Sequence, residues 1–190
     1  MAGTRRVRVR NGDHGYGLVT KALHWTMFAA IAAQFVLGYV LDADDGGRGR
    51  GRGRGGGSGP GSGQGRGRGG DSGYDVFDDP VLTAHVVLGL TILTLAAIRL
   101  VWRITTPLPP WASTLSHRDR TLAHWTERAL YLLMFAIPLS GLWLIAIGDD
   151  DALAPHVVSH VAFFIVFALH LGLVAKHQFI DRDRLLRRML

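Results

Sequence analysis

The sequence predicts an all-α protein, a four-helix up-and-down transmembrane bundle. The first observation is four apolar runs, each long enough for a helix to cross a bilayer, which takes about 20 residues. The second is how little lies outside them: one low-complexity stretch and short polar segments, so no sizeable soluble domain is expected. The third is the absence of cysteine, which excludes disulfides, thiolate metal ligands and iron–sulfur clusters. The expected spans are 22–41, 83–102, 121–147 and 154–175.

The chain opens with a basic segment, 1–21, which is expected to be a tail on the cytoplasmic side. The first span, 22–41, is too long for the core of a typical cleavable signal. His24 lies in its first turn beside Trp25, an aromatic residue suited to the membrane interface. Gln34 is the other polar residue of note, and its amide should face a neighbouring helix or a cofactor instead of lipid.

The outer loop, 42–82, contains an insert, 46–73, made almost entirely of Gly, Arg and Ser. This composition buries too little apolar surface to offset its ordering entropy, so the insert is expected to be disordered. Arginine–glycine runs can bind nucleic acid, but the expected topology places this loop outside, so no nucleic-acid partner is expected. Contact with membrane lipid, through anionic headgroups, is favoured.

The later spans carry polar residues near their ends. The second span begins near His85, and Arg99 near its other end can extend its long side chain to the interface. Pro138 should bend the third span. A Pro-rich connector separates the second and third spans, a short acidic loop separates the third and fourth, and a basic tail follows. These segments are 103–120, 148–153 and 176–190.

The distribution of Lys and Arg predicts the orientation. If four helices alternate, fourteen of these residues lie on one side, in the two tails and around the connector. Six lie on the other side, all of them inside the insert and partly offset by neighbouring aspartates. Positive charge is retained on the cytoplasmic side of membranes, so both termini are expected in the cytoplasm.

The fourth span has no Asp, Glu, Lys or Arg, yet it holds His156, His160 and His170. Ionisable side chains inside a membrane are costly and point to function. His156 and His170 are fourteen residues apart, so on a helix they share one face within roughly 40° and lie about 21 Å apart along the axis. One helix therefore presents an imidazole near each end, on one side.

These two histidines have counterparts at matching depths in other spans. His24 opens the first span from the cytoplasmic side, at the level of His170, and His85 opens the second from the outer side, at the level of His156. A planar haem between two helices needs one imidazole from each helix at one depth. The chain offers this arrangement twice, and iron ligation would also satisfy the buried imidazoles. The pairing by depth therefore favours a haem site at each of the two levels.

Two other interpretations of the histidines remain open. Each could be a hydrogen-bonded side chain of a helix bundle, which does not account for the pairing by depth. His156 and His160 also form an i, i+4 pair that could bind zinc or iron, as in a histidine-rich metal-binding membrane protein. No carboxylate inside the span accompanies them. His160, rotated by roughly 80° from His170, is either an accessory residue of the outer site or a rival ligand.

Several sequence motifs together resemble the bacterial cytochrome b561 family. They are K-A-L-H-W around His24, A-H-V-V-L-G around His85, L-A-H-W around His124, Y-L-L-M-F-A-I-P-L-S-G-L in the third span, and the pair His156 and His170. The resemblance covers all four spans and leaves only the insert outside. It implies a four-helix bundle in the bacterial inner membrane with two non-covalent b haems. It also implies that His24, His85, His156 and His170 are the haem iron ligands.

The resemblance implies electron transfer between quinone, either ubiquinone or menaquinone, and another redox donor or acceptor. One branch of the family oxidises superoxide, and its fourth span often begins with a Trp-His-Glu-like sequence. Here the sequence is Pro155-His156-Val157. The alternative is a haem-containing membrane anchor subunit of a dehydrogenase or hydrogenase. Whether the chain oligomerises is left open.

Other residues are candidates for secondary roles. Phe163 and Phe167 share the histidine-bearing face of the fourth span and could pack between the haems. Haem propionates need cationic or hydroxyl partners, and a quinone needs groups that exchange protons. The propionate candidates are Lys21, Arg99 and Arg128, and the proton-exchange candidates are Lys176, His177 and His124.

Overall fold

The protein is described from a computed structural model. Residues 50–75, which hold most of the predicted insert 46–73, lie outside the described residues. For residues 42–49 only the backbone is described. The described residues are 9–12, 15–49, 76, 79–111, 115–148, 153–183, 186 and 189.

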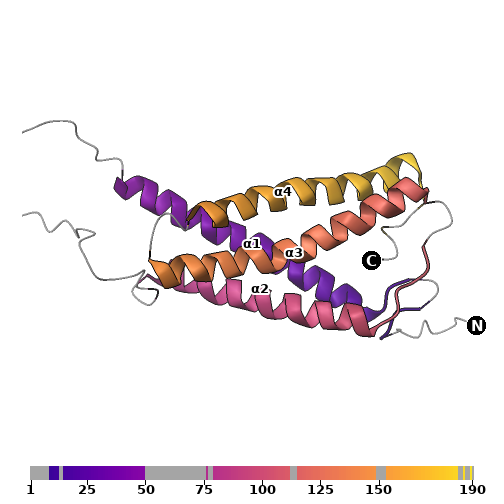
Figure 1. Ribbon diagram of the computed structural model, residues 1–190, viewed down its shortest axis with the longest axis horizontal. Coiled ribbons are helices and arrows are strands. Elements are labelled where there is room, and N and C mark those ends of the chain that lie inside the picture. The colour runs from indigo at the N-terminus through magenta and orange to yellow at the C-terminus, as the bar shows by residue number, and fades with distance from the viewer. Residues whose placement is uncertain are drawn as a thin grey trace, which may run out of the picture.

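Four long helices follow one another, and each is long and apolar enough to cross a membrane. They are α1 (Leu18–Gly49), α2 (Pro80–Thr105), α3 (His117–Ile147) and α4 (Leu153–Ala175), and a short π-helix, η2 (Lys176–Ile180), continues α4. Successive helices run in opposite directions (Figure 1). The described part contains no strand. The prediction of an all-α, four-helix membrane bundle is confirmed. We name the end where α1 begins the inner end and the opposite end the outer end.

Capping residues set several helix ends, and this extends the helices beyond the predicted spans. Asp79 accepts hydrogen bonds from the backbone N–H groups that open α2, and Pro80 stands at its first position. Ser116 caps α3 in the same way. Gly148 closes α3 in the left-handed conformation, with φ 67°, which glycine adopts without a steric penalty. Hydropathy marks only the membrane-crossing part of a helix, whereas caps mark where the helix ends.

The first helix differs most from its predicted span. The first span was predicted to end at residue 41, and α1 continues to Gly49. Residues 46–49, predicted to be disordered, therefore have a helical backbone. Adding a residue to an existing helix costs far less than starting a new one, which explains how a helix can continue into unfavourable sequence.

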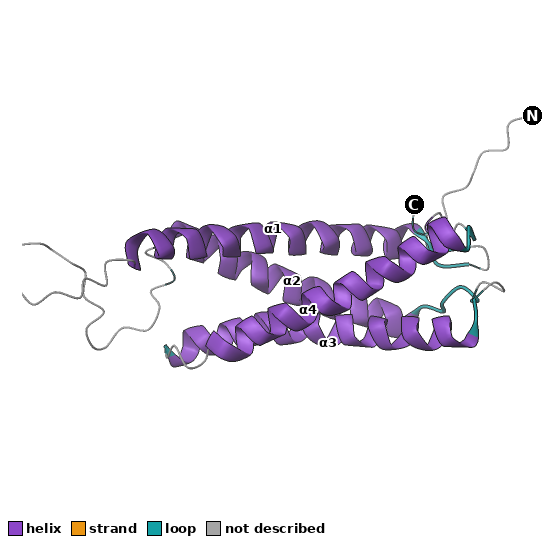
Figure 2. Ribbon diagram, turned by 90° about the horizontal axis from the view of Figure 1, so that it is seen from above, coloured by secondary structure: helices purple, strands orange, loops and turns teal. Residues whose placement is uncertain are grey.

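The helices pack in chain order: α1 on α2, α2 on α3, and α3 on α4. The small buried core comes from the first three helices and consists of Met27, Ile92, Ala96 and Met134. In contrast, α4 crosses the bundle obliquely (Figure 2) and has few close backbone approaches to α1 or α2 among the described residues. Large apolar side chains such as Leu132 and Ile165 are about two-thirds exposed, as expected for surfaces that face lipid.

Aromatic rings bridge α1 and α4 where their backbones do not meet. Phe35 of α1 lies 5.6 Å from the buried Phe163 and 4.5 Å from Phe164, measured between ring centroids. Phe28 of α1 stacks on Phe167 of α4 at 6.4 Å. Phe163 and Phe167 stack on each other at 5.6 Å with an interplanar angle of 8°. An aromatic layer thus fills the space between the inner and outer histidines of α4.

Candidate functional site

The inner histidines, His24 of α1 and His170 of α4, come close enough to interact electrostatically. Arg99 of α2 lies between the helices. Its Nη2 donates a hydrogen bond to His24 Nδ1 at 3.2 Å, and its Nε donates to the hydroxyl of Tyr131 at 3.2 Å. We call His24 and His170 the inner pair.

An ion pair completes the surroundings of the inner pair. Arg103 of α2 donates to both carboxylate oxygens of Glu127 in α3, at 2.8 Å and 3.3 Å. Glu127 and Arg99 both interact electrostatically with His170. Because Glu127 is already paired with Arg103, Arg99 supplies the net positive charge beside the inner pair.

The outer histidines, His85 of α2 and His156 of α4, also interact electrostatically, and we call them the outer pair. His160 interacts with both of them. Its ring lies 4.3 Å from the ring of His156 and 5.3 Å from that of Phe35, between centroids. The sequence left His160 without a firm role, and the structure places it beside the outer pair.

A contact with α3 orients the ring of His156. Its Nδ1 lies 3.1 Å from the carbonyl oxygen of Ile137 and 3.0 Å from Ser140 Oγ. A carbonyl only accepts, so Nδ1 carries the proton and donates it. Gly141 allows the close approach, because a Cβ there would lie 3.1 Å from His156 Cε1. Sequence reasoning did not identify Ile137, Ser140 and Gly141, although the Ser-Gly pair within an apolar span was a visible signal.

Two residues of α1 lie against His85. Gln34 of α1 donates from Nε2 to the His85 carbonyl oxygen at 3.0 Å, so this amide faces a neighbouring helix. A Cβ at Gly38 would lie 3.5 Å from His85 Cε1, which is ordinary contact. The Nδ1 atom of His85 is buried and has no hydrogen-bond partner among the described residues.

The structure separates the candidates for secondary roles. Arg99 lies at the inner pair, whereas Arg128 is exposed and stacks on Trp125, with its guanidinium 5.7 Å from the ring centroid. Lys21 is partly buried in the first turn of α1. His124 packs edge-on against Trp111 at 5.0 Å. Of these four, Arg99 is the residue that the structure brings to a histidine pair.

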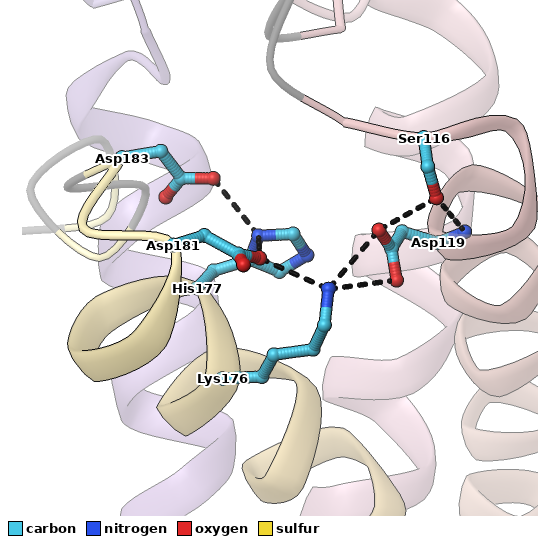
Figure 3. Close-up of polar contacts among 6 residues, drawn as sticks. All are labelled: Ser116, Asp119, Lys176, His177, Asp181 and Asp183. Atoms are coloured by element: carbon cyan, nitrogen blue, oxygen red, sulfur yellow. Dashed lines mark hydrogen bonds and ion pairs between the residues drawn. The ribbon is translucent and has the colours of Figure 1, made fainter.

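The remaining candidates, Lys176 and His177, belong to a polar cluster at the inner end (Figure 3). Lys176 Nζ contacts both carboxylate oxygens of Asp119 at 3.1 Å and Asp181 at 2.9 Å. His177 is buried and its Nδ1 lies 2.8 Å from Asp183. Ligand atoms of Asp119, His177 and Asp181 come within 4.8 Å of one another. Lys176 provides the positive charge among these carboxylates.

Comparison with known proteins identifies the family. The family model described as prokaryotic cytochrome b561 matches residues 15–190. The chain belongs to the prokaryotic cytochrome b561 family. It is 25% identical to cytochrome b561 homolog 2 of Escherichia coli (strain K12) over 203 aligned positions, which cover 95% of this chain and 93% of that protein. It is 31% identical to cytochrome b562 of Cereibacter sphaeroides over 106 positions, which cover 56% of this chain and 65% of that protein.

Membership of this family makes the chain a membrane b-type cytochrome that acts in electron transfer, and it implies haem b as the cofactor. The outer pair fits that cofactor. With the proton of His156 on Nδ1, the lone pair of the neutral imidazole is on Nε2, the nitrogen free to bind iron. His85 adds a partly buried imidazole whose buried Nδ1 has no hydrogen-bond partner among the described residues.

The inner pair fits after one side-chain movement. Arg99 is a donor only, so His24 Nδ1 accepts and the proton of the neutral ring is on Nε2. Iron binding through Nε2 requires the opposite tautomer, in which Arg99 no longer donates to Nδ1. The side chain of His170 makes no hydrogen bond to another described residue, so its ring can adopt either tautomer.

Proposed function

We propose that this protein carries electrons across the membrane with two b haems, one held by the inner pair and one by the outer pair. The observation that carries the proposal is the grouping of four imidazoles into two pairs close enough to interact electrostatically, with one member of each pair on α4. Haem supplies one-electron reduction and reoxidation of its iron when bound. In this proposal His24 and His170 would hold the haem at the inner level, and His85 and His156 would hold the haem at the outer level.

The residues of the chain have distinct parts in this function. Two imidazoles at each level would hold the iron and leave no position for O₂, so electron transfer is favoured over oxygen chemistry. The aromatic layer formed by Phe28, Phe35, Phe163 and Phe167 keeps water out of the region between the levels. Arg99, once it releases His24, can pair with a haem propionate.

We further propose that the partner at the inner end is a quinone, either ubiquinone or menaquinone. Quinone reduction consumes protons, and ionisable side chains that can exchange them, His124, Glu127 and His177, are found at this end. A one-electron donor such as superoxide would act at the outer end. Membership of the prokaryotic family supports a location in the bacterial inner membrane, and the Lys and Arg distribution supports an orientation with both termini in the cytoplasm.

A reduced-minus-oxidised spectrum of the purified chain, with a haem assay, tests the proposal. We expect a b-type α band and two haems per chain. Purified protein without haem would contradict the proposal and favour the histidine-rich metal-binding alternative. A quinone-reduction assay on the isolated chain then tests the quinone link. Two haems without turnover would favour the membrane anchor subunit of a dehydrogenase or hydrogenase.

A further inference from the structure

Polar contacts tie α4 to α3 at both ends of the bundle. At the outer end, His156 of α4 meets Ile137 and Ser140 of α3. At the inner end, Lys176 meets Asp119, with Nζ 3.1 Å from each carboxylate oxygen. The helix that carries one histidine of each pair is therefore held to its neighbour at two points.

The distance between the outer contact (His156 with Ser140) and the inner contact (Lys176 with Asp119) is about the same along both helices. Twenty positions separate His156 from Lys176, and twenty-one separate Ser140 from Asp119 on the antiparallel α3. At 1.5 Å per residue these are both about 30 Å. Because the spacing is equal, both contacts can form at once, and a shift of α4 along α3 would break both of them.

Asp119 is held in position by a residue of its own helix, Ser116 of α3. The Ser116 hydroxyl, which caps α3, lies 2.7 Å from Asp119 Oδ2, and the Asp119 backbone N–H donates to the same hydroxyl at 3.2 Å (Figure 3). The side chain of Asp119 is 18% exposed. The carboxylate is therefore oriented by the first turn of α3 before Lys176 reaches it.

Lys176 is positioned by the chain reversal that follows it. The π-helix η2 ends at Ile180, and Asp181 caps it through a backbone hydrogen bond to the Lys176 carbonyl. This places Asp181 2.9 Å from Lys176 Nζ and 3.0 Å from His177 Nδ1, and Arg182 follows with φ 53°. The buried His177 also contacts Asp183, so the turn is fastened to the end of α4. Lys176 is held in place without the help of α3.

The packing of α4 is one-sided. It packs extensively on α3 but has few close backbone approaches to α1 and α2 among the described residues, and its contacts with α1 include aromatic rings without directional bonds. In a membrane there is no hydrophobic driving force between helices, so polar contacts act together with van der Waals packing in setting the position of one helix against another. His170 lies six residues before Lys176, about 9 Å along the axis, and moves with it.

We propose that Asp119 and Lys176 are positioning residues that set the depth of α4 at the inner end and so keep His170 opposite His24. This inference rests on the proposed haem ligation. The inner pair is then positioned by the contact between Lys176 and Asp119, whereas the outer pair is positioned by the contact of His156 with Ile137 and Ser140.

The test compares Lys176→Met and Asp119→Asn with Lys176→Arg in the full chain. Arg118→Gln is the matched control, because it removes an exposed charge adjacent to Asp119. The readouts are the low-spin ferric haem signals in electron paramagnetic resonance and the two midpoint potentials. His170→Ala identifies which signal belongs to the inner haem. We expect Lys176→Met and Asp119→Asn to change the inner signal and potential alone, and Lys176→Arg and Arg118→Gln to match the parent protein.

Three results would overturn the inference. The inner signal could be unchanged in both neutral variants, both haems could change equally, or Arg118→Gln could have the same effect as Asp119→Asn. Loss of the whole folded protein in both neutral variants, with Lys176→Arg intact, would also contradict a local role. A parent protein that lacks haem, or has no bis-histidine signal, would instead contradict the proposed function.

Discussion

The inner and outer pairs have the same side chains in different electrostatic surroundings. Arg99 stands beside His24 and interacts with His170, so the inner pair has a net positive neighbour. Around His85 and His156, in contrast, no charged residue of the described part contributes to the electrostatics. The same ligand set is therefore placed in a cationic site at one end and in a neutral site at the other.

This difference predicts unequal reduction potentials. A nearby positive charge favours the reduced iron, which carries one positive charge fewer, and this raises the potential at the inner level. A histidine that donates its other N–H to a carbonyl is a more basic ligand and favours the oxidised iron. His156 makes this bond to Ile137. We expect the inner haem to have the higher midpoint potential, which favours electron flow from the outer to the inner end.

Removing one histidine at a time should have the largest effect. We expect His24→Ala and His170→Ala to lose the inner haem and keep the outer one, and His85→Ala and His156→Ala to do the reverse. Each variant should therefore bind one haem per chain instead of two, measured as haem per protein. His160→Ala should keep both. If His160→Ala loses the outer haem and His156→Ala keeps it, the outer ligand is His160.

The close approach at Gly141 offers a narrower test of the outer pair. A Cβ at this position would lie 3.1 Å from His156 Cε1, so Gly141→Ala should displace the ring and lower outer haem occupancy. Gly172→Ala is the matched control, since a Cβ there meets nothing within 4 Å. Both changes favour the helix by about 0.5–1 kcal/mol, which separates the local clash from helix stability. Haem content after purification is the readout, and equal occupancy in the two variants would refute the close contact.

Arg99→Gln should reduce the difference in midpoint potential between the inner and outer haems. Removing the positive charge should lower the midpoint potential of the inner haem and leave that of the outer haem unchanged. A charge interaction of about 1 kcal/mol, the value for two unit charges roughly 4 Å apart in bulk water, corresponds to roughly 40 mV for a one-electron couple. Redox titration followed at the α band measures both potentials. An unchanged inner potential would show that Arg99 does not act on that haem.

Ser140→Ala should have the smallest effect. The variant removes the hydroxyl 3.0 Å from His156 Nδ1 but keeps the Ile137 carbonyl, so the proton stays on Nδ1. We expect full haem content and a slightly higher outer potential, because the ligand loses part of its basicity. The same redox titration detects the shift. A shift of the inner potential instead would mean that the assignment of the two levels is reversed.

The bundle and the depth of the histidines could be predicted from local sequence, whereas the directions of individual side chains could not. The bundle followed from the length of the apolar runs, and the grouping of the histidines by depth followed from helix geometry. Gln34 was expected to face a neighbour, and it donates to His85 of α2. Arg128 and Arg99 were both candidates to bind a haem propionate, because each is a cation near the same end of a span. The rotation of α3, however, turns Arg128 outward onto Trp125. Charge and depth can be read from the sequence, whereas the direction of a side chain depends on how its helix packs.

The sequence by itself determined the number of helices, their apolar composition and the spacing of His156 and His170, because hydropathy and helical periodicity are local properties of the chain. Only the tertiary structure decided which nitrogen of His156 is free, since this depends on a carbonyl nineteen residues away. It also decided that Lys176 pairs with Asp119, fifty-seven residues away, at the inner end. Such contacts depend on the register between helices, which becomes defined only when the helices pack.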